Sequence, residues 1–202
     1  MKIDIILEPD LTPEEICDLG LIAESYGIDS IWTSNYFSHW DPFISLSQLA
    51  NQSSQIKLGV LAVSPFEMHP LKIANSLLTL NEVSHGRAQV AVGAGEGNLT
   101  AMSLDTPKKI VLAVREALEI IIKACSDDLK EGFSGEIFSV ALPCDYGWAK
   151  HDKPVVYGTA YRHMMMRMEG RVADGVYIGA TPPEVLEEAI VNINTGKKKR
   201  LE

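Results

Sequence analysis

The chain has 202 residues, of which 46% are hydrophobic and 22% charged, and its formal net charge is −9 at pH 7. These totals are typical of a globular domain with a substantial core. The acidic balance disfavours partners such as nucleic acid or an anionic membrane surface, and no apolar run reaches the roughly 20 residues of a membrane span. The three cysteines are odd in number and lack Cys-x-x-Cys spacing, so we expect neither disulfides nor a metal site, and a cytoplasmic location.

Short apolar segments alternate with helical patterns along the whole chain. We predict strands over residues 3–7, 30–33, 56–63, 88–92, 154–157 and 176–178. We predict that the helices after them open at Thr12-Pro13-Glu14-Glu15, at Asp41-Pro42, before Leu71, near Asp105-Thr106-Pro107, before Met164 and at Thr181-Pro182-Pro183-Glu184. The alternation around Gly135, over residues 133–142, predicts a small hairpin outside the main sheet.

Six strand–helix units with short connections predict an α/β fold with a parallel sheet. A doubly wound sheet and a (β/α) barrel both satisfy this pattern, and the barrel is favoured because no helix-free crossover marks a reversal of strand order. A (β/α)8 TIM barrel usually needs about 250 residues. We therefore expect an incomplete barrel of about six units over residues 1–195, followed by a basic tail over residues 196–202.

The first and last strands of such a sheet would each have an unpaired edge. Another chain, a reorganised dimer or further residues of a longer protein could cover these edges. We therefore expect a homodimer or a higher oligomer.

Polar residues follow the predicted strands at the end where barrel enzymes work. They include Asn35, Tyr36, Ser64, Glu96, Asn98 and Thr159. In a barrel these side chains would converge on one mouth, whereas the alternative interpretation is that each belongs to an ordinary surface loop.

The loop Gly93-Ala94-Gly95-Glu96-Gly97-Asn98 is the most informative of these segments. Its glycines would let the backbone approach a ligand closely, and Glu96 could donate or accept a proton in a partly dry mouth. A solvated loop glutamate is the alternative. We reject a nicotinamide site, because the predicted helix starts about ten residues later and pyrophosphate binding needs a helix N-terminus at the loop.

The segment Gly158-Thr159-Ala160 follows the fifth strand and precedes a helix. Backbone N–H groups there could point into the mouth and bind a phosphate, although a short connecting turn is the alternative. Trp32 and the methionines of residues 164–168 are better explained as core than as a cofactor site.

Residues 80–96 resemble the signature of the luciferase-like flavin and deazaflavin barrel enzymes. The matching residues are Leu80-Asn81-Glu82-Val83-Ser84-x-Gly86-Arg87 and Val90-Ala91-Val92-Gly93-x-Gly95-Glu96. Further matches are Asp41-Pro42-Phe43, Lys57-Leu58-Gly59, Ser64-Pro65, His69-Pro70, residues 113–117 and Gly170-x-x-Ala173-Asp174-Gly175-Val176. Within that superfamily the chain is most similar to the branch that uses coenzyme F420, particularly methylenetetrahydromethanopterin reductase.

The resemblance implies a barrel that holds coenzyme F420, or alternatively FMN, in its mouth and transfers hydride from the ring to a stacked small-molecule substrate. It implies that Leu61–Ala62 is the peptide bond that supports the ring, that Ser64, Gly95 and Asn98 lie near the cofactor, and that Gly158, Thr159 and Ala160 lie near its phosphate. Glu96 matches the active-site carboxylate of the family, and Tyr36 with Asn35 would line the reacting face.

Three positions differ from the family pattern. Asn35-Tyr36 replaces the usual Asp-His pair, Ile6 occupies the place of a glutamate in the first strand, and Leu61 is bulkier than the usual residue.

Our leading hypothesis is an oxidoreductase that transfers hydride between F420 and a small substrate such as a methylene-tetrahydropterin C1 carrier. The alternatives are an FMN-dependent monooxygenase subunit and a non-catalytic cofactor-binding paralogue.

Overall fold

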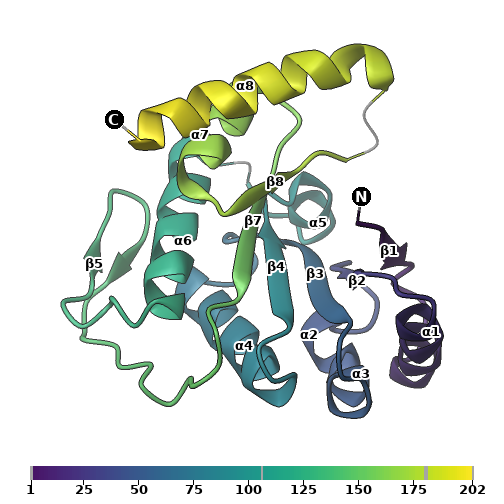
Figure 1. Ribbon diagram of the computed structural model, residues 1–202. Helices are drawn as coiled ribbons and strands as arrows, with labels where there is room; N and C mark the ends of the chain where they lie inside the picture. The colour runs from purple at the N-terminus through teal and green to yellow at the C-terminus, as the bar shows by residue number, and fades with distance from the viewer. Residues whose placement is uncertain (1, 106, 180–181, 202) are drawn as a thin grey trace.

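The computed structural model describes residues 2–105, 107–179 and 182–201 and has a six-stranded parallel sheet at its centre (Figure 1). The strands lie in the order β1-β2-β3-β4-β7-β8, and every neighbouring pair is parallel. Their bounds are β1 (Asp4–Leu7), β2 (Ser30–Ser34), β3 (Lys57–Val63), β4 (Ala88–Val92), β7 (Val155–Thr159) and β8 (Gly175–Tyr177). Because spatial order follows chain order without a reversal, the sheet is half of a barrel rather than a doubly wound sheet.

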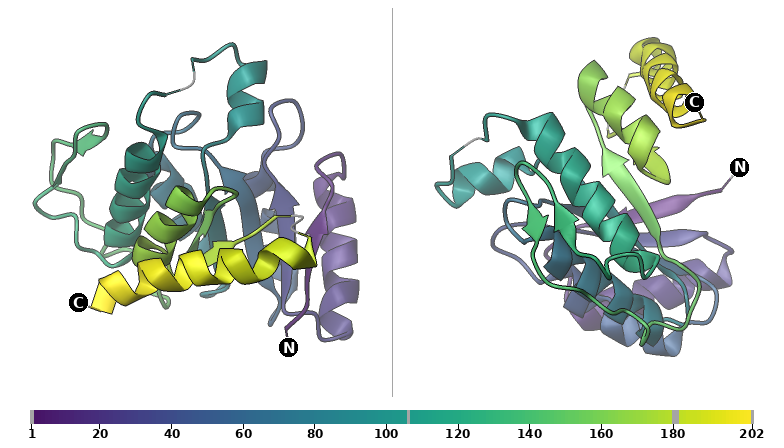
Figure 2. Two further views of the ribbon diagram at one scale, coloured as in Figure 1. Left: turned by 90° about the horizontal axis from the view of Figure 1, so that it is seen from above. Right: turned by 90° about the vertical axis from the view of Figure 1, so that its left-hand side faces the viewer.

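The helices follow the strands, as the alternation in the sequence predicts. They are α1 (Pro13–Ser25), α2 (Pro42–Ser45), α3 (Ser47–Gln52), α4 (Pro70–Val83), α5 (Glu96–Ala101), α6 (Ile110–Cys125), α7 (His163–Val172) and α8 (Pro183–Leu201). Figures 1 and 2 show α1, α3, α4 and α6 along the outer face of the curved sheet, while α8 lies against α7 near the last strand.

Local capping signals explain where the first helices begin. Thr12 and Glu15 form the predicted capping box: the Glu15 N–H donates to Oγ1 of Thr12 (3.2 Å) and the Thr12 N–H donates to Oε2 of Glu15 (2.8 Å). Asp41 caps α2 by accepting hydrogen bonds from the N–H groups of Phe43 and Ile44. Both helix starts are confirmed.

Other boundaries differ from the prediction. The long amphipathic helix α6 begins at Ile110 rather than near Asp105, and the short helix α5 starts directly at Glu96, where we expected a loop. The segment after β2 forms two short helices, α2 and α3, instead of one. The predicted cap Thr181 lies outside the described residues.

The basic run Lys197–Arg200 does not form a separate tail. It lies in the last turns of α8, where cations are favourable because the unpaired carbonyl groups of a helix end carry partial negative charge. Arg200 also donates a hydrogen bond from Nη1 to the backbone O of Ala173 (2.9 Å), just after α7. The helix therefore continues through the segment in which we expected a tail.

The two faces of the sheet pack differently. The outer face contributes residues such as Ile31, Val60 and Val90 to the main core beneath the helices. The inner face carries a smaller cluster of Trp32, Leu61 and Ala91, with Ala62, Tyr157 and Tyr177 packed against it. A Cβ atom on Gly59 would overlap the indole of Trp32, so the absence of a side chain there makes room for the ring. Trp32 is therefore a core residue, as predicted.

The predicted hairpin consists of β5 (Phe133–Ser134) and β6 (Ser139–Val140), which pair antiparallel outside the main sheet beside α6 (Figure 2). Glu116 on α6 anchors it by accepting hydrogen bonds from the N–H groups of residues 136, 137 and 138, at 2.8–2.9 Å. Burial opposes the ionisation of Glu116, but these three donors outweigh it and hold its pKa below the usual range.

Among the described residues, β1 and β8 each pair with one neighbouring strand only. The first strand is also exposed on both faces: Ile5 and Ile6 retain 37% and 44% of their accessible surface. The prediction of an incomplete (β/α) barrel with about six units is thus confirmed.

Candidate active site at the carboxyl ends of the strands

The carboxyl ends of β3, β4 and β7 meet at one end of the sheet, which we call the mouth. A Cβ atom on Gly93, just after β4, would overlap Oγ1 of Thr159 at the end of β7. A Cβ atom on Gly95 would lie 2.5 Å from Cβ of Ser64, which follows β3. Oγ of Ser64 also donates a hydrogen bond to the backbone O of Ala94 (2.9 Å). Ser64, Gly95 and Thr159, which were predicted to belong to one site, therefore come from three separate loops and lie at the same end of the sheet.

The end of β2 joins this group through Asn35. Its backbone N–H donates to O of Leu61 (2.7 Å), and its side-chain Nδ2 donates to O of Ala62 (3.1 Å). The Leu61–Ala62 peptide bond is cis, and the register between β3 and β4 shifts at the same place, between Val60 and Val63. The bond that the family resemblance singles out thus lies beside Asn35 at the mouth.

A carboxylate that the sequence analysis missed lies beside the residues of the mouth. Glu67 accepts hydrogen bonds at Oε2 from Nδ2 of Asn35 (2.9 Å) and from Nδ2 of Asn98 (3.1 Å). Glu67 lies three residues beyond Ser64, in the same loop. The sequence analysis selected polar residues directly after the strands, and a search three residues further along this loop would have included Glu67.

Asn98 is buried, with 8% of its surface exposed, because α5 folds back over the mouth. Its Nδ2 also contacts the backbone O of Asn35 at 3.4 Å. Within the described residues Asn98 therefore links α5 to the ends of β2 and β3.

The two side chains that we expected to react lie at the edge of the mouth. Glu96 is the first residue of α5 and is exposed, so the expectation of a partly dry environment is not met. Its side chain is directed outward because the helix turns its buried face, with Asn98 and Leu99, toward the sheet. Tyr36 is 46% exposed and stacks on Phe37 with ring centroids 4.6 Å apart.

Two residues of the segment Gly158-Thr159-Ala160 make contacts within the fold that keep them from a bound phosphate. The N–H of Ala160 donates to O of Tyr177 in β8 (3.2 Å) and is not available to a phosphate. Gly158 is the fourth residue of β7 and faces outward, since a Cβ atom there would overlap the carboxyl group of Glu169 on α7. Only Thr159, whose hydroxyl lies beside Gly93, is directed to the mouth.

The first half of the signature motif lies at the opposite ends of the strands. Arg87, just before β4, donates to backbone O atoms of Ala50, Ser53, Ile56 and Ser84 at 2.7–3.1 Å, and to Oγ of Ser53 at 2.7 Å. These bonds tie the end of α3 to the start of β4, at the barrel end associated with stability rather than catalysis.

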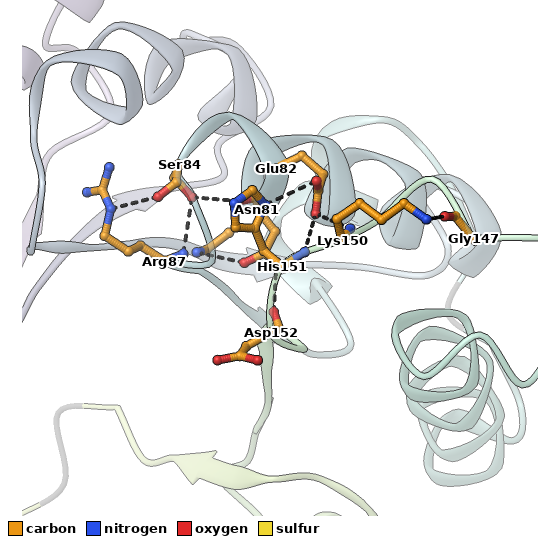
Figure 3. A network of polar contacts seen from close by, with 9 residues as sticks. Asn81, Glu82, Ser84, Arg87, Gly147, Lys150, His151 and Asp152 are labelled. Atoms are coloured by element: carbon orange, nitrogen blue, oxygen red, sulfur yellow. Dashed lines mark hydrogen bonds and ion pairs between the residues drawn. The ribbon is translucent and has the colours of Figure 1, made fainter.

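Figure 3 shows how this network continues into the segment before β7. Nδ2 of Asn81 donates to O of Asp152 (2.9 Å), and Glu82 accepts hydrogen bonds from the N–H groups of Lys150 and His151. The N–H of Ala88, in turn, donates to Oδ1 of Asn81 (3.2 Å). This half of the motif therefore has a structural role.

Over the described ranges, no group of three or more His, Cys, Asp or Glu side chains is arranged to hold a metal ion. Nor does any helix in this part of the chain have the length and apolar character to cross a membrane.

The profile of the luciferase-like monooxygenase family matches residues 3–201. The chain belongs to this family. The resemblance inferred from the glycine loop and its flanks is thus confirmed.

Three relatives of this luciferase-like chain are informative. The 5,10-methylenetetrahydromethanopterin reductase of Archaeoglobus fulgidus is 30% identical over 199 residues, which cover 98% of this chain and 59% of the relative. The F420-dependent glucose-6-phosphate dehydrogenase of Kineococcus radiotolerans is 27% identical over 175 residues, or 81% of this chain and 51% of the relative.

The third is the solved structure of the coenzyme F420-dependent tetrahydromethanopterin reductase of Methanopyrus kandleri. It superposes with a TM-score of 0.84 at 25% identity and covers 98% of this chain and 61% of that one. The chain thus spans about three fifths or less of the length of these relatives.

Proposed function

We propose that this chain binds coenzyme F420 at the mouth and takes part in two-electron hydride transfer between this deazaflavin and a small organic substrate. A methylene-tetrahydropterin C1 carrier is the substrate class that we favour, because a relative 30% identical over nearly the whole chain is a reductase of that kind. The observation on which the proposal rests is the meeting of Leu61–Ala62, Asn35 and the glycine loop at one end of the sheet.

The residues at the mouth fit a flat ring cofactor. Gly95 has φ = +68° and no side chain, and a Cβ atom there would fill the space beside Ser64 and Glu67. Gly97 has no heavy atom within 4 Å of where its Cβ would be, so the outer part of the loop is open. Ala62, Tyr157 and Tyr177 supply partly buried apolar surface on the inner face of the sheet.

Each residue then has a defined task. Leu61 and Ala62 would support the ring, while Ser64, Gly95, Asn98 and Thr159 would shape the space around it. Asn35 and Tyr36 would line the reacting face, and Glu96 would exchange a proton with the substrate from the edge of the mouth. When bound, F420 supplies the hydride chemistry, and the protein supplies position and electrostatics.

The assembly and location follow from the same interpretation. We propose a homodimer or higher oligomer in the cytoplasm, with the small-molecule substrate as the other partner. The unpaired edges of β1 and β8 favour association, and three cysteines without a disulfide among the described residues fit a reducing compartment.

Titration of the purified protein with F420 and with FMN tests the proposal. We expect saturable binding of F420, followed by absorbance or fluorescence, and oxidation of reduced F420 on addition of a methylene-tetrahydropterin. Failure of the wild-type protein to bind F420 would overturn the proposal.

Two alternatives have their own motives and outcomes. An FMN-dependent monooxygenase subunit would bind FMN in preference to F420. A non-catalytic cofactor-binding paralogue is motivated by Asn35-Tyr36 in place of Asp-His and by Ile6 in place of glutamate. It would bind cofactor tightly without measurable turnover, and Glu96→Gln would change neither the affinity for the cofactor nor the turnover.

A further inference from the structure

Glu67 holds together three parts of the mouth that are far apart in the chain. It lies between β3 and α4, and its Oε2 accepts hydrogen bonds from Asn35 at the end of β2 and from Asn98 on α5. The distances of 2.9 and 3.1 Å are those of well-formed amide-to-carboxylate bonds. A single oxygen atom thus fixes two carboxamide side chains.

The other oxygen of Glu67 has no such role. Oε1 is buried and has no hydrogen-bond partner among the described residues. A Cβ atom on Gly95 would lie 2.6 Å from it, so the glycine loop closes over this oxygen. No ion pair in the described part of the chain involves Glu67. Its surroundings therefore position it through the two amides alone.

The orientation of Asn35 follows from these contacts. Its Nδ2 donates both to Oε2 of Glu67 (2.9 Å) and to O of Ala62 (3.1 Å), which uses both of its N–H groups. The amide plane is then fixed, and with it the direction of Oδ1, which lies in that plane. Within the described residues, no donor is directed at this Oδ1.

We infer that Glu67 is a positioning residue that fixes the carboxamide of Asn35, so that Oδ1 accepts a hydrogen bond from an N–H or O–H group of the bound ligand. The ligand meant here is the ring cofactor of the proposed function or the substrate on it, so the inference rests on that function. Glu67 itself stays beneath the glycine loop and acts through Asn35.

Substitutions of Glu67 distinguish its role in positioning Asn35 from a general effect of its charge. Glu67→Gln keeps an oxygen that can accept from both amides, whereas Glu67→Ala removes it. We expect Glu67→Ala to weaken the binding of F420, or of FMN if that is the cofactor, about tenfold, since two hydrogen bonds that hold the amides of Asn35 and Asn98 are lost. Glu67→Gln should stay within about twofold of the wild type. Glu131→Ala, at an exposed position, is the matched control for the lost charge.

A double-mutant cycle with Asn35→Ala tests the route of the effect. If Glu67 acts through Asn35, then Glu67→Ala should add less than about twofold to the loss caused by Asn35→Ala. Additive losses would overturn the inference, as would equal losses in Glu67→Gln and Glu67→Ala.

NMR of the side-chain NH2 groups gives a readout that needs no cofactor. In the wild type, the Asn35 and Asn98 protons should exchange slowly with water, and their signals should shift in Glu67→Ala but little in Glu67→Gln. Fast exchange in the wild type would overturn the inference even if no Glu67 variant folds. If the wild type binds neither cofactor, the proposed function fails, and the NMR result still decides whether Glu67 positions Asn35.

Discussion

The carboxyl group of Glu169 packs directly against the Cα atom of Gly158. A side chain on Gly158 would overlap that carboxyl group, and Glu169 has no exposed surface. Neither carboxyl oxygen has a hydrogen-bond partner among the described residues. Burial raises the pKa of Glu169 from 4.5 to about 9, so the side chain is a neutral acid at pH 7. Strand β7 and helix α7 thus meet at an uncharged carboxyl group.

The stability of the protein should therefore fall as the pH rises. An acid whose pKa is higher in the folded state stabilises the fold fully below its unfolded pKa of 4.5 and loses this contribution up to about pH 9. Relative to Glu169→Gln, which cannot ionise, the wild type should lose up to about 1.4 kcal/mol of unfolding free energy per pH unit in this window. Urea denaturation of both proteins at several pH values measures the difference.

The comparison with Glu169→Gln removes the effects of all other titrating groups, which the two proteins share. A stability difference that stays constant from about pH 5 to pH 9 would show that Glu169 does not change its pKa on folding.

Arg87 offers a second prediction. Arg87→Ala removes its guanidinium donors from the carbonyl groups of Ala50, Ser53, Ile56 and Ser84. We expect a loss of about 2–4 kcal/mol in unfolding free energy, because buried acceptors are left without donors. Arg87→Lys keeps the charge but not the planar fork, and should recover only part of the loss. Denaturant titration measures both variants.

The affinity for cofactor should not change in either Arg87 variant as long as the protein is folded. Arg87 precedes β4, whereas the mouth lies at the other end of the strands. A loss of cofactor affinity comparable to that of a mouth variant would contradict the structural role assigned to this half of the motif.

Two neighbouring glycines provide a matched pair. Gly95 has a positive φ and lies against Ser64 and Glu67, while Gly97 lies within α5 with open space around it. Gly95→Ala should cost about 1–3 kcal/mol of stability and weaken cofactor binding. Gly97→Ala should be neutral or stabilise by up to about 1 kcal/mol, because alanine is the better helix former. Thermal unfolding and cofactor titration of both variants measure the two effects. Equal losses in Gly95→Ala and Gly97→Ala would contradict the inference that the loop needs a glycine at position 95 beside Ser64 and Glu67.

Local signals allowed much of the fold to be predicted. The capping box of Thr12 and Glu15 and the Asp41 cap depend on residues within one turn, so their chemistry is readable along the chain. The buried strand Ala88–Val92 is apolar at nearly every position, as a parallel central strand requires. The order of the strands followed from their regular alternation with helices.

The mouth was harder to predict because its geometry depends on contacts between distant segments. Helix α5 was missed because it is short and contains Gly97, which lowers helix propensity, and burial of Leu99 and the bonds of Asn98 compensate only in the folded chain. Glu67 follows Ser64 by three residues in the same loop, but no nearby residue indicates that its carboxyl group accepts hydrogen bonds from two amides. Its partners Asn35 and Asn98 lie about thirty residues away on either side.

The exposed position of Glu96 makes its proposed role open to a direct test. A proton donor must reach its substrate, and a residue at the first position of α5 can do so from the edge of the mouth without disturbing the buried amides. Glu96→Gln should leave stability and cofactor affinity within about twofold of the wild type, since no bond to the Glu96 side chain holds the described part of the fold together. It should lower the rate of hydride transfer about a hundredfold or more if the glutamate supplies the proton. Stopped-flow measurement of F420 oxidation by wild type, Glu96→Gln and the surface control Glu131→Gln gives the answer. Unchanged turnover in Glu96→Gln would exclude this carboxylate as the proton donor and favour an acid on the substrate itself or in solvent.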